Sequence, residues 1–359
     1  MKKILLSLIV CFIALSSTIT STYANDEGAL EEQEIDKNLI NEDNLDKTPE
    51  QITDIGTIKI VQNLMNVLGY DCGTADGIIG EKTKNAVKDY QKSVGMTEDG
   101  IVSDVFVAFL YLDVRDRVSK IQLDADTVID TWESNNSSCE SAYQQAANGA
   151  NRIYELLTCM ALDKDNGSYK SEIADIRVEH LLQDLSASSA LHQEVNGLYR
   201  AVEMACVLAK ELDTAGKYTD YIDGVADTLE SNNENCSTAP QQIVNGEYRM
   251  VEILQVIGYE SDKLGAYKSV MDGVIDDLYS KNASCQSAPQ QSANGTYRTV
   301  EMLQAIYYGL DYNKKLESYV KNINDSWITN DSNSTSALHQ EVNGLYRSVE
   351  LMYIIASLL

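Results

Sequence analysis

The chain has two regions that differ in their pattern of apolar and polar positions. Between residues 55 and 112, apolar side chains follow three short helical patterns that are separated by glycine-containing turns. From residue 113 to the C-terminus, each stretch of about 49 residues carries two helical segments, and the upstream one keeps its apolar side chains on one face, as Tyr218, Ile222, Val225 and Leu229 do. These patterns predict an all-α protein, with a small three-helix module followed by five tandem helical hairpins.

The second region is built on a repeated element with an Asn-Gly pair at its centre. The Asn stands at positions 148, 196, 245, 294 and 343, and we number each repeat from it. Ala at −6, Gln at −3, Gly at +1, Arg at +4 and Glu at +7 are the same in all five copies. A period of 20 to 50 residues is typical of units that bury their apolar faces only against each other. The sequence therefore predicts one cooperative domain over residues 113–359.

The repeats are compatible with an open α-solenoid or with a closed α/α ring. An open array needs a polar outer face on its last repeat, but the chain ends in the apolar segment Leu351–Leu359. We expect something to cover that segment: the first hairpin, the three-helix module, or another protein or second subunit.

The repeated element has the signals of a helix start. Ser or Thr at −7 with Gln or His at −4 forms a capping box, and Pro240 and Pro289 suit a first turn. The upstream helices are expected at about 116–133, 169–185, 218–230, 267–279 and 316–328, with the polar tracts 134–138 and 231–235 as connections. Gly at +1 costs about 1 kcal/mol of helix propensity. It indicates either a close approach to a neighbouring helix or a break between two shorter helices.

Four polar residues of each repeat, at −3, 0, +4 and +7, lie along one helical edge, which we call the repeat edge. It is either an internal ladder of hydrogen bonds and ion pairs or a polar groove for a polymer such as glycan or a stem peptide. A glycan-cleaving Glu among the five at +7 stays open, whereas His192 and His339 are expected to be helix-start residues. The repeat edge comprises Gln145, Asn148, Arg152, Glu155, Gln193, Asn196, Arg200, Glu203, Gln242, Asn245, Arg249, Glu252, Gln291, Asn294, Arg298, Glu301, Gln340, Asn343, Arg347 and Glu350.

Three motifs occur in order within residues 53–112: VQxLxxxLGY at 61–70, DGIIGEKTxxAVxxYQ at 76–91 and DGIV at 99–102. Together they resemble the peptidoglycan-binding domain of many bacterial wall hydrolases, with Ile79 and Tyr90 where the family usually has Phe. The resemblance implies a three-helix module that binds the wall polymer without cutting it. Taken singly, each Asp-Gly pair is a turn signal. The motif residues are Gln62, Gly69, Tyr70, Asp76, Gly77, Gly80, Thr83, Ala86, Val87, Tyr90, Gln91, Asp99 and Gly100.

The N-terminal residues predict export. Lys2 and Lys3, a short apolar run and a small-residue ending at Ala24 are typical of a signal peptide over residues 1–24. Residues 25–52 are rich in Asp and Glu, and this composition predicts an acidic linker. The formal net charge of −27 becomes −29 without the two lysines, and such a charge repels nucleic acid. No later segment is long and apolar enough for a membrane span.

Six cysteines remain after the signal peptide, and three of them stand at −9 in their repeats. Equivalent helices of stacked repeats lie roughly 8–10 Å apart, farther than a disulfide reaches, so we expect buried thiols. We expect no metal site and no cofactor, since the chain has only three His and no C-x-x-C motif. The sequence predicts an exported, wall-associated protein that binds peptidoglycan, with a repeat domain for ligand binding or assembly. The alternative is a wall hydrolase whose catalytic domain is the repeat region.

Overall fold

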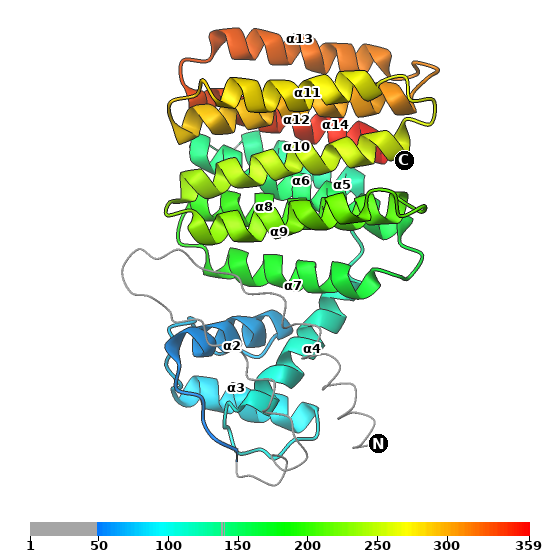
Figure 1. Cartoon of the computed structure of the whole chain (residues 1–359). Helices are drawn as coiled ribbons and strands as arrows, with labels where there is room; N and C mark the ends of the chain where they lie inside the picture. The colour runs from blue at the N-terminus through cyan, green and yellow to red at the C-terminus, as the bar shows by residue number, and fades with distance from the viewer. Residues whose placement is uncertain (1–48, 138, 140) are drawn as a thin grey trace. The chain divides into compact units, whose positions relative to one another are not determined.

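The computed structural model describes residues 49–359 except 138 and 140, so the predicted signal peptide and most of the acidic linker lie outside the described residues. In the described part the chain is all-α, with thirteen helices from α2 to α14 and no strand (Figure 1). It divides between Val118 and Ser119 into two compact units. We describe each unit by itself.

The first unit is a three-helix module made of α2 (Ile55–Leu68), α3 (Glu81–Ser93) and α4 (Asp104–Lys120). Helix α2 ends where the sequence predicts, because Gly69 adopts a left-handed conformation with φ of 94°. Tyr90 of α3 is buried and meets Phe106 of α4 edge to face, with ring centroids 5.4 Å apart. The aromatic contact joins the last two helices over a small apolar core.

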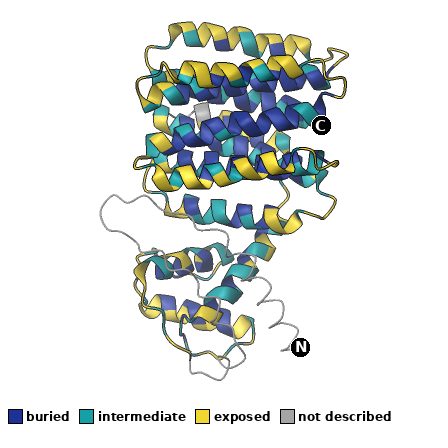
Figure 2. Cartoon of the chain, viewed as in Figure 1, coloured by how far each residue is buried: buried dark blue, intermediate teal, exposed yellow. Residues whose placement is uncertain are grey.

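The second unit consists of five hairpins, each with an outer helix followed by an inner helix. The outer helices are α5 (Ala125–Ser137), α7 (Lys170–Ser186), α9 (Thr219–Asn235), α11 (Lys268–Asn282) and α13 (Glu317–Asn333). The inner helices are α6 (Ala142–Lys164), α8 (Ala190–Leu212), α10 (Ala239–Ser261), α12 (Ala288–Leu310) and α14 (Ala337–Ala356). Figure 2 shows that the inner helices are mostly buried and the outer ones carry much of the exposed surface.

The inner helices close into a ring, because α14 packs against α6 as well as against α12. The first hairpin thus covers the apolar face of the last helix. Two contacts mark this closure: the Tyr353 hydroxyl donates to Asp126 Oδ1 at 2.6 Å, and the rings of Trp132 and Tyr346 meet edge to face at 4.9 Å. Of the two architectures that the repeats allow, the structure has the closed α/α ring.

The glycine at +1 makes the close approach possible in every repeat. A Cβ on Gly246 would lie 3.1 Å from Leu198 Cβ, the residue at +2 of the preceding repeat. The same relation closes the ring, since a Cβ on Gly149 would lie 2.9 Å from Leu345 Cβ of the fifth repeat. The inner helices run through the Asn-Gly pair without a break. The alternative of two shorter helices is therefore wrong.

The inner helices begin where the capping signals predict, but Ser141, Thr238 and Ser287 make no side-chain capping bond. Each follows a Ser or Thr at −7 that serves as the N-cap residue. The hydroxyl oxygens of Ser189 and Ser336 accept hydrogen bonds from the backbone N–H of His192 and His339. His192 and His339 thus lie in the first turns of their helices, at exposed positions.

Several helix boundaries differ from the sequence prediction: α5, α9, α11 and α13 end at Ser137, Asn235, Asn282 and Asn333, three to five residues beyond the expected ends. The single helix expected at 116–133 is wrong, because α4 continues to Lys120 and α5 begins only at Ala125. The polar tracts expected as connections are instead the last turns of α5 and α9, which end at Ser137 and Asn235. Ser and Asn have modest helix propensity, but tertiary packing along the rest of each helix overrides it.

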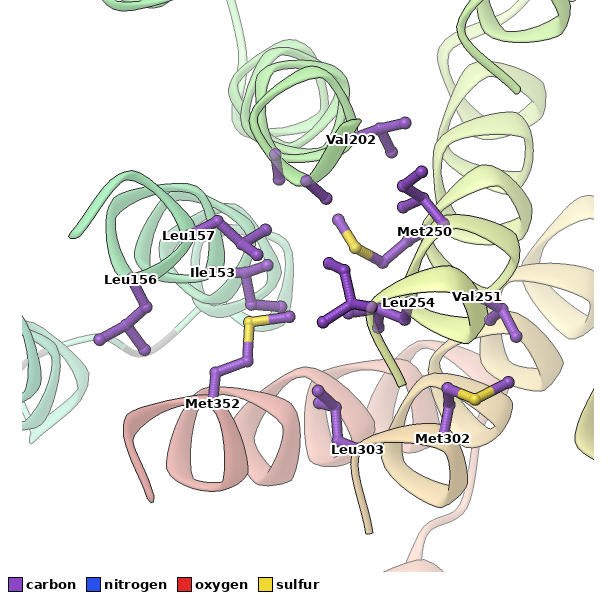
Figure 3. Close-up of a cluster of buried hydrophobic side chains, with 14 of the residues drawn as sticks. Ile153, Leu156, Leu157, Val202, Met250, Val251, Leu254, Met302, Leu303 and Met352 are labelled. Carbon is purple, nitrogen blue, oxygen red and sulfur yellow. The ribbon is translucent and has the colours of Figure 1, made fainter. Parts of the chain in front are cut away.

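The centre of the ring is filled by apolar side chains toward the C-terminal halves of the inner helices. Figure 3 shows side chains from α6, α10, α12 and α14 pointing toward one another, among them Ile153, Leu254, Leu303 and Met352. All of these are 2% exposed or less. The interior is therefore a packed core at this level, not a channel.

The remaining expectations concern the cysteines and the membrane. The six described cysteines are free thiols; Cys72 and Cys206 are buried. The three at −9, Cys139, Cys236 and Cys285, are only partly buried, because they lie at or just beyond the ends of the outer helices. No helix among the described residues is long and apolar enough to cross a membrane.

Candidate functional site

The motifs of the three-helix module are organised around two glutamine side chains. The first is Gln62 of α2, which is buried. Its Nε2 donates to Asp76 Oδ1, to the Ile78 carbonyl and to Thr83 Oγ1, each at 3.1 Å, and its Oε1 accepts from the Gly77 N–H at 2.8 Å. One side chain thus holds the whole Asp-Gly turn against α2.

The second glutamine repeats this arrangement on α3. Gln91 Nε2 donates to Asp99 Oδ1 at 2.7 Å, and Gln91 Oε1 accepts from the Gly100 N–H at 2.9 Å. Gly77 and Gly100 have φ of 81° and 73°, so both turns need a residue that tolerates the left-handed region. The two Asp-Gly turns of the sequence motif are equivalent structures, each clamped by the side chain of a buried glutamine.

Most other motif residues belong to the same scaffold. Thr83, Ala86, Val87 and Tyr90 lie on the buried face of α3. Gly80 is the N-cap residue of α3, Gly69 ends α2, and the Tyr70 hydroxyl donates to Ser93 Oγ at 2.8 Å. The structure brings the motif residues together as a framework around the two turns.

Two exposed apolar side chains beside the first turn were not singled out from the sequence. Ile55 and Ile78 are 61% and 67% exposed. Ile55 lies against this turn, because a Cβ on Gly77, the residue before Ile78, would meet Ile55 Cγ2 at 2.5 Å. Clustered exposed apolar residues are more informative than single ones. This pair is a candidate contact surface on a turn whose backbone is fixed.

The repeat edge of the ring contains the same ion pair five times. In each repeat the Arg at +4 pairs with the Glu at +7 of its own helix, at 2.5 to 3.0 Å. The Arg side chains are between 4% and 16% exposed, so these pairs lie mostly out of solvent. Burial raises the pKa of Glu252, while Arg249 and a hydrogen bond from Tyr279 oppose that shift. The charges of the repeat edge are therefore partnered within the protein.

The Asn and Gln of the repeat edge tie helices together. Asn245, Asn294 and Asn343 each donate to a carbonyl of the preceding outer helix, sixteen residues upstream. Asn245 also donates to the Tyr199 hydroxyl of the preceding repeat at 3.0 Å. Gln242 Nε2 donates to Asn233 Oδ1 at 2.7 Å. These bonds join the outer and inner layers and, at Asn245, neighbouring repeats.

A second polar system, which the sequence analysis did not single out, lies inside the ring. Glu194 of α8 and Glu341 of α14 stand at −2 in their repeats, and Glu247 of α10 stands at +2. They are 0%, 4% and 1% exposed, respectively. We call these three residues the interior carboxyl cluster. Its sequence signal is a charged residue at positions where other repeats carry Ala146, Ile243 or Leu198.

The members of this cluster face one another, and within the part of the chain that the structure describes no cation is paired with them. The Glu194 carboxyl is within hydrogen-bonding reach of the Glu341 carboxyl. When both are ionised neither can donate, and both oxygens of Glu194 are then buried without a hydrogen-bond partner. Ser292 of α12 donates to Glu341. Burial raises the pKa of all three carboxyls, and the neighbouring carboxyls raise those of Glu194 and Glu247 further.

This arrangement can hold a proton between two carboxyl groups. Its inward position at the N-terminal halves of the inner helices separates it from the repeat edge, where each carboxylate has an arginine. In the described part of the chain, no group of three or more His, Cys, Asp or Glu residues is arranged to hold a metal ion.

Comparison with known proteins identifies the first unit. Residues 56–110 match the family model described as "Putative peptidoglycan binding domain", and both glutamine clamps fall inside this match. Neither the curated proteins nor the solved structures include a match to this chain. The first unit is thus a domain of the peptidoglycan-binding type, and the ring has no counterpart in these comparisons.

Proposed function

We propose that the protein is exported to the cell wall and attaches to peptidoglycan through residues 56–110, while the ring serves ligand binding or assembly. The observation that carries the proposal is the family match over a module whose two motif turns are held rigidly by Gln62 and Gln91. A fixed turn presents its exposed side chains at little entropic cost, which favours recognition. Ile55 and Ile78 are the contact residues that this geometry favours.

The test is co-sedimentation of the full mature chain with purified sacculi. We expect the wild-type protein to pellet and Ile78→Asp to lower the bound fraction at least fivefold, because the side chain is exposed and its loss leaves the clamp intact. Ile328→Asp is the matched control, since Ile328 is also an exposed isoleucine, at 54%, but lies on the ring. Wild-type protein that stays in the supernatant would overturn the proposal.

The same incubation examines the hydrolase alternative. We expect no release of soluble muropeptides or reducing ends, because each Glu at +7 is paired with its own Arg and the interior carboxyl cluster is closed to solvent. Heat-sensitive release that disappears on changing one glutamate of the ring would make the protein a wall hydrolase.

The C-terminal helix, whose apolar segment was expected to need a cover, is covered by the first hairpin of the same chain. Its apolar face packs on the first hairpin, and Tyr353 is bonded to Asp126 of that hairpin. A role of the ring in assembly would use its outer helices, where exposed side chains such as Tyr319 and Val270 lie.

A further inference from the structure

One junction between repeats is hollow. A cavity of about 300 Å³ lies where the fourth repeat meets the fifth, between helices α11 to α14. Its size is at the lower end for ligand sites and suits a small ligand or a single unit of a polymer. It is lined by Lys281, Gln290, Ala293, Asn294, Tyr297, Arg298, Asp331 and Gln340.

The neighbouring junction has a different lining at three positions. Position by position, the junction of the third and fourth repeats differs only in having Asn232, Val244 and Asn282 where the hollow has Lys281, Ala293 and Asp331. Asn232 donates there to the repeat-edge asparagine, Asn245, at 3.3 Å. The hollow thus has a smaller apolar side chain and two charged residues where the neighbouring junction has a valine and two asparagines.

The hollow keeps hydrogen-bonding groups that the protein itself does not satisfy. Asp331 Oδ1 is buried and has no hydrogen-bond partner. At the equivalent position of the third repeat Asn233 accepts from Gln242 at 2.7 Å, whereas Asn282 Oδ1 of the fourth repeat is, like Asp331 Oδ1, buried without a partner. A buried acceptor without a partner is unfavourable, and a donor from a ligand would remove that cost. The site therefore favours a ligand that brings hydroxyl or N–H donors to Asp331.

The other groups of the hollow restrict the ligand further. Lys281 and the buried Arg298 are already paired with Asp277, and Arg298 also with Glu301. Neither is therefore free to bind an anion, which Asp331 would repel. Carboxamides of Gln290, Asn294 and Gln340 can both donate and accept. The Tyr297 ring, backed by Trp327 at 4.2 Å, offers an aromatic face. Planar polar side chains around an aromatic ring suit a neutral, hydroxyl-rich ligand.

We propose that the hollow at the junction of the fourth and fifth repeats binds a sugar residue of the wall glycan, with Asp331 accepting from its hydroxyl or acetamido N–H groups. The identification of the glycan rests on the proposed function, because a protein attached to peptidoglycan is surrounded by N-acetylated sugars. The binding chemistry itself rests on the lining of the hollow.

The experiment titrates the full mature chain with a soluble N-acetylglucosamine tetramer. The protein has two tryptophans, Trp132 and Trp327, so the Trp132→Phe variant reports through Trp327, next to the hollow. We expect saturable change in its emission and matching heat in calorimetry. The triple variant Lys281→Asn, Ala293→Val, Asp331→Asn gives the hollow the lining residues of the neighbouring junction. It should bind at least tenfold more weakly and melt within 2 °C or above the wild type, since this set of residues already packs there.

Asp325→Asn on the same helix is the matched control, because Asp325 is exposed and paired with Lys321; it should bind like the wild type. Absence of saturation with wild-type protein, or equal binding by the triple variant, would overturn the proposal. Saturable binding of a soluble stem peptide in place of the sugar would also overturn it. Sacculus binding through the module is measured by adding Ile78→Asp to the triple variant. An unchanged bound fraction, with tetramer binding by the wild type intact, refutes the proposed function alone; a fivefold loss there, with no tetramer binding by the wild type, refutes the sugar site alone.

Discussion

The repeat edge and the interior carboxyl cluster are two polar systems on the same inner helices, and they follow opposite rules. The repeat edge has the same residues in all five repeats, and each Glu has an Arg 2.5 to 3.0 Å away. The interior cluster occurs in three repeats, and its carboxyls face only each other and Ser292. Repetition thus marks the interactions that build the ring, whereas departures from it mark places where the protein accepts an energetic cost.

The largest effect should come from breaking one pair of the repeat edge. Arg249→Met leaves the Glu252 carboxylate, 8% exposed at its side chain, without its cation. Removing one partner of a buried pair costs about 3–5 kcal/mol. We expect a loss of that order in the free energy of unfolding, followed by tryptophan fluorescence, because both tryptophans lie in the ring.

The double variant Arg249→Met, Glu252→Gln should recover part of this loss, because no charge is then stranded. A melting midpoint of Arg249→Met equal to that of the wild type would show that the repeat edge is a solvated groove and not an internal ladder.

An intermediate effect, of opposite sign, should come from the interior cluster. Glu194→Gln replaces an ionisable group with an amide that can donate to Glu341, and it should raise stability near neutral pH by roughly 1–3 kcal/mol, the range for an unsatisfied buried polar group. Destabilisation by Glu194→Gln at pH 7 would show that the cluster has a cationic partner.

The sign of the pH dependence follows from the raised pKa values. The folded ring holds protons on Glu194, Glu247 and Glu341 more tightly than the unfolded chain does, where the ordinary Glu value is 4.5. Stability should therefore be greatest below about pH 4.5 as far as these groups decide it, and fall as the pH rises from there through the raised values. Denaturant unfolding at several pH values measures this slope, and Glu194→Gln should flatten it.

The smallest effect should come from an exposed pair on an outer helix. Lys321 and Asp325 are 69% and 57% exposed at their side chains and are 2.5 Å apart. Exposed i,i+4 pairs contribute about 0.3–0.5 kcal/mol, so Lys321→Met should change the unfolding free energy by about that much or less. A loss as large as that of Arg249→Met would mean that pairing, and not burial, sets the strength of the repeat edge.

The sequence predicts those parts of the fold that depend on neighbours along the chain. Ser189 and Ser336 indicate helix starts, because an N-cap side chain bonds a backbone N–H only three residues further along the chain. The repeated glycine predicts a close contact, since Gly246 lacks the Cβ that would meet Leu198. The role of Gln62 and Gln91 as clamps is implicit in the family motif but becomes visible only when their bonds are seen.

Other parts depend on distant residues and could not be predicted. Glu194 and Glu341 are 147 positions apart in the sequence, and only ring closure brings them together. Helices α5 and α9 extend beyond their predicted ends, because packing overrides the turn propensity of the Asn and Ser residues in their last turns. The hollow beside Asp331 is lined by residues from four helices of two repeats, and its volume becomes visible only in the structure.

Ring closure also determines the order in which the domain can be completed. In an open repeat array all contacts are local, so folding can start anywhere and spread. Here Tyr353 must reach Asp126, 227 residues away, before the first inner helix has both of its neighbours. Contacts of such long range slow folding, because the entropy of closing the loop is lost before the contact forms. During synthesis from the N-terminus, α6 therefore exposes the face that α14 will cover. Packing of the last helix, α14, completes the domain.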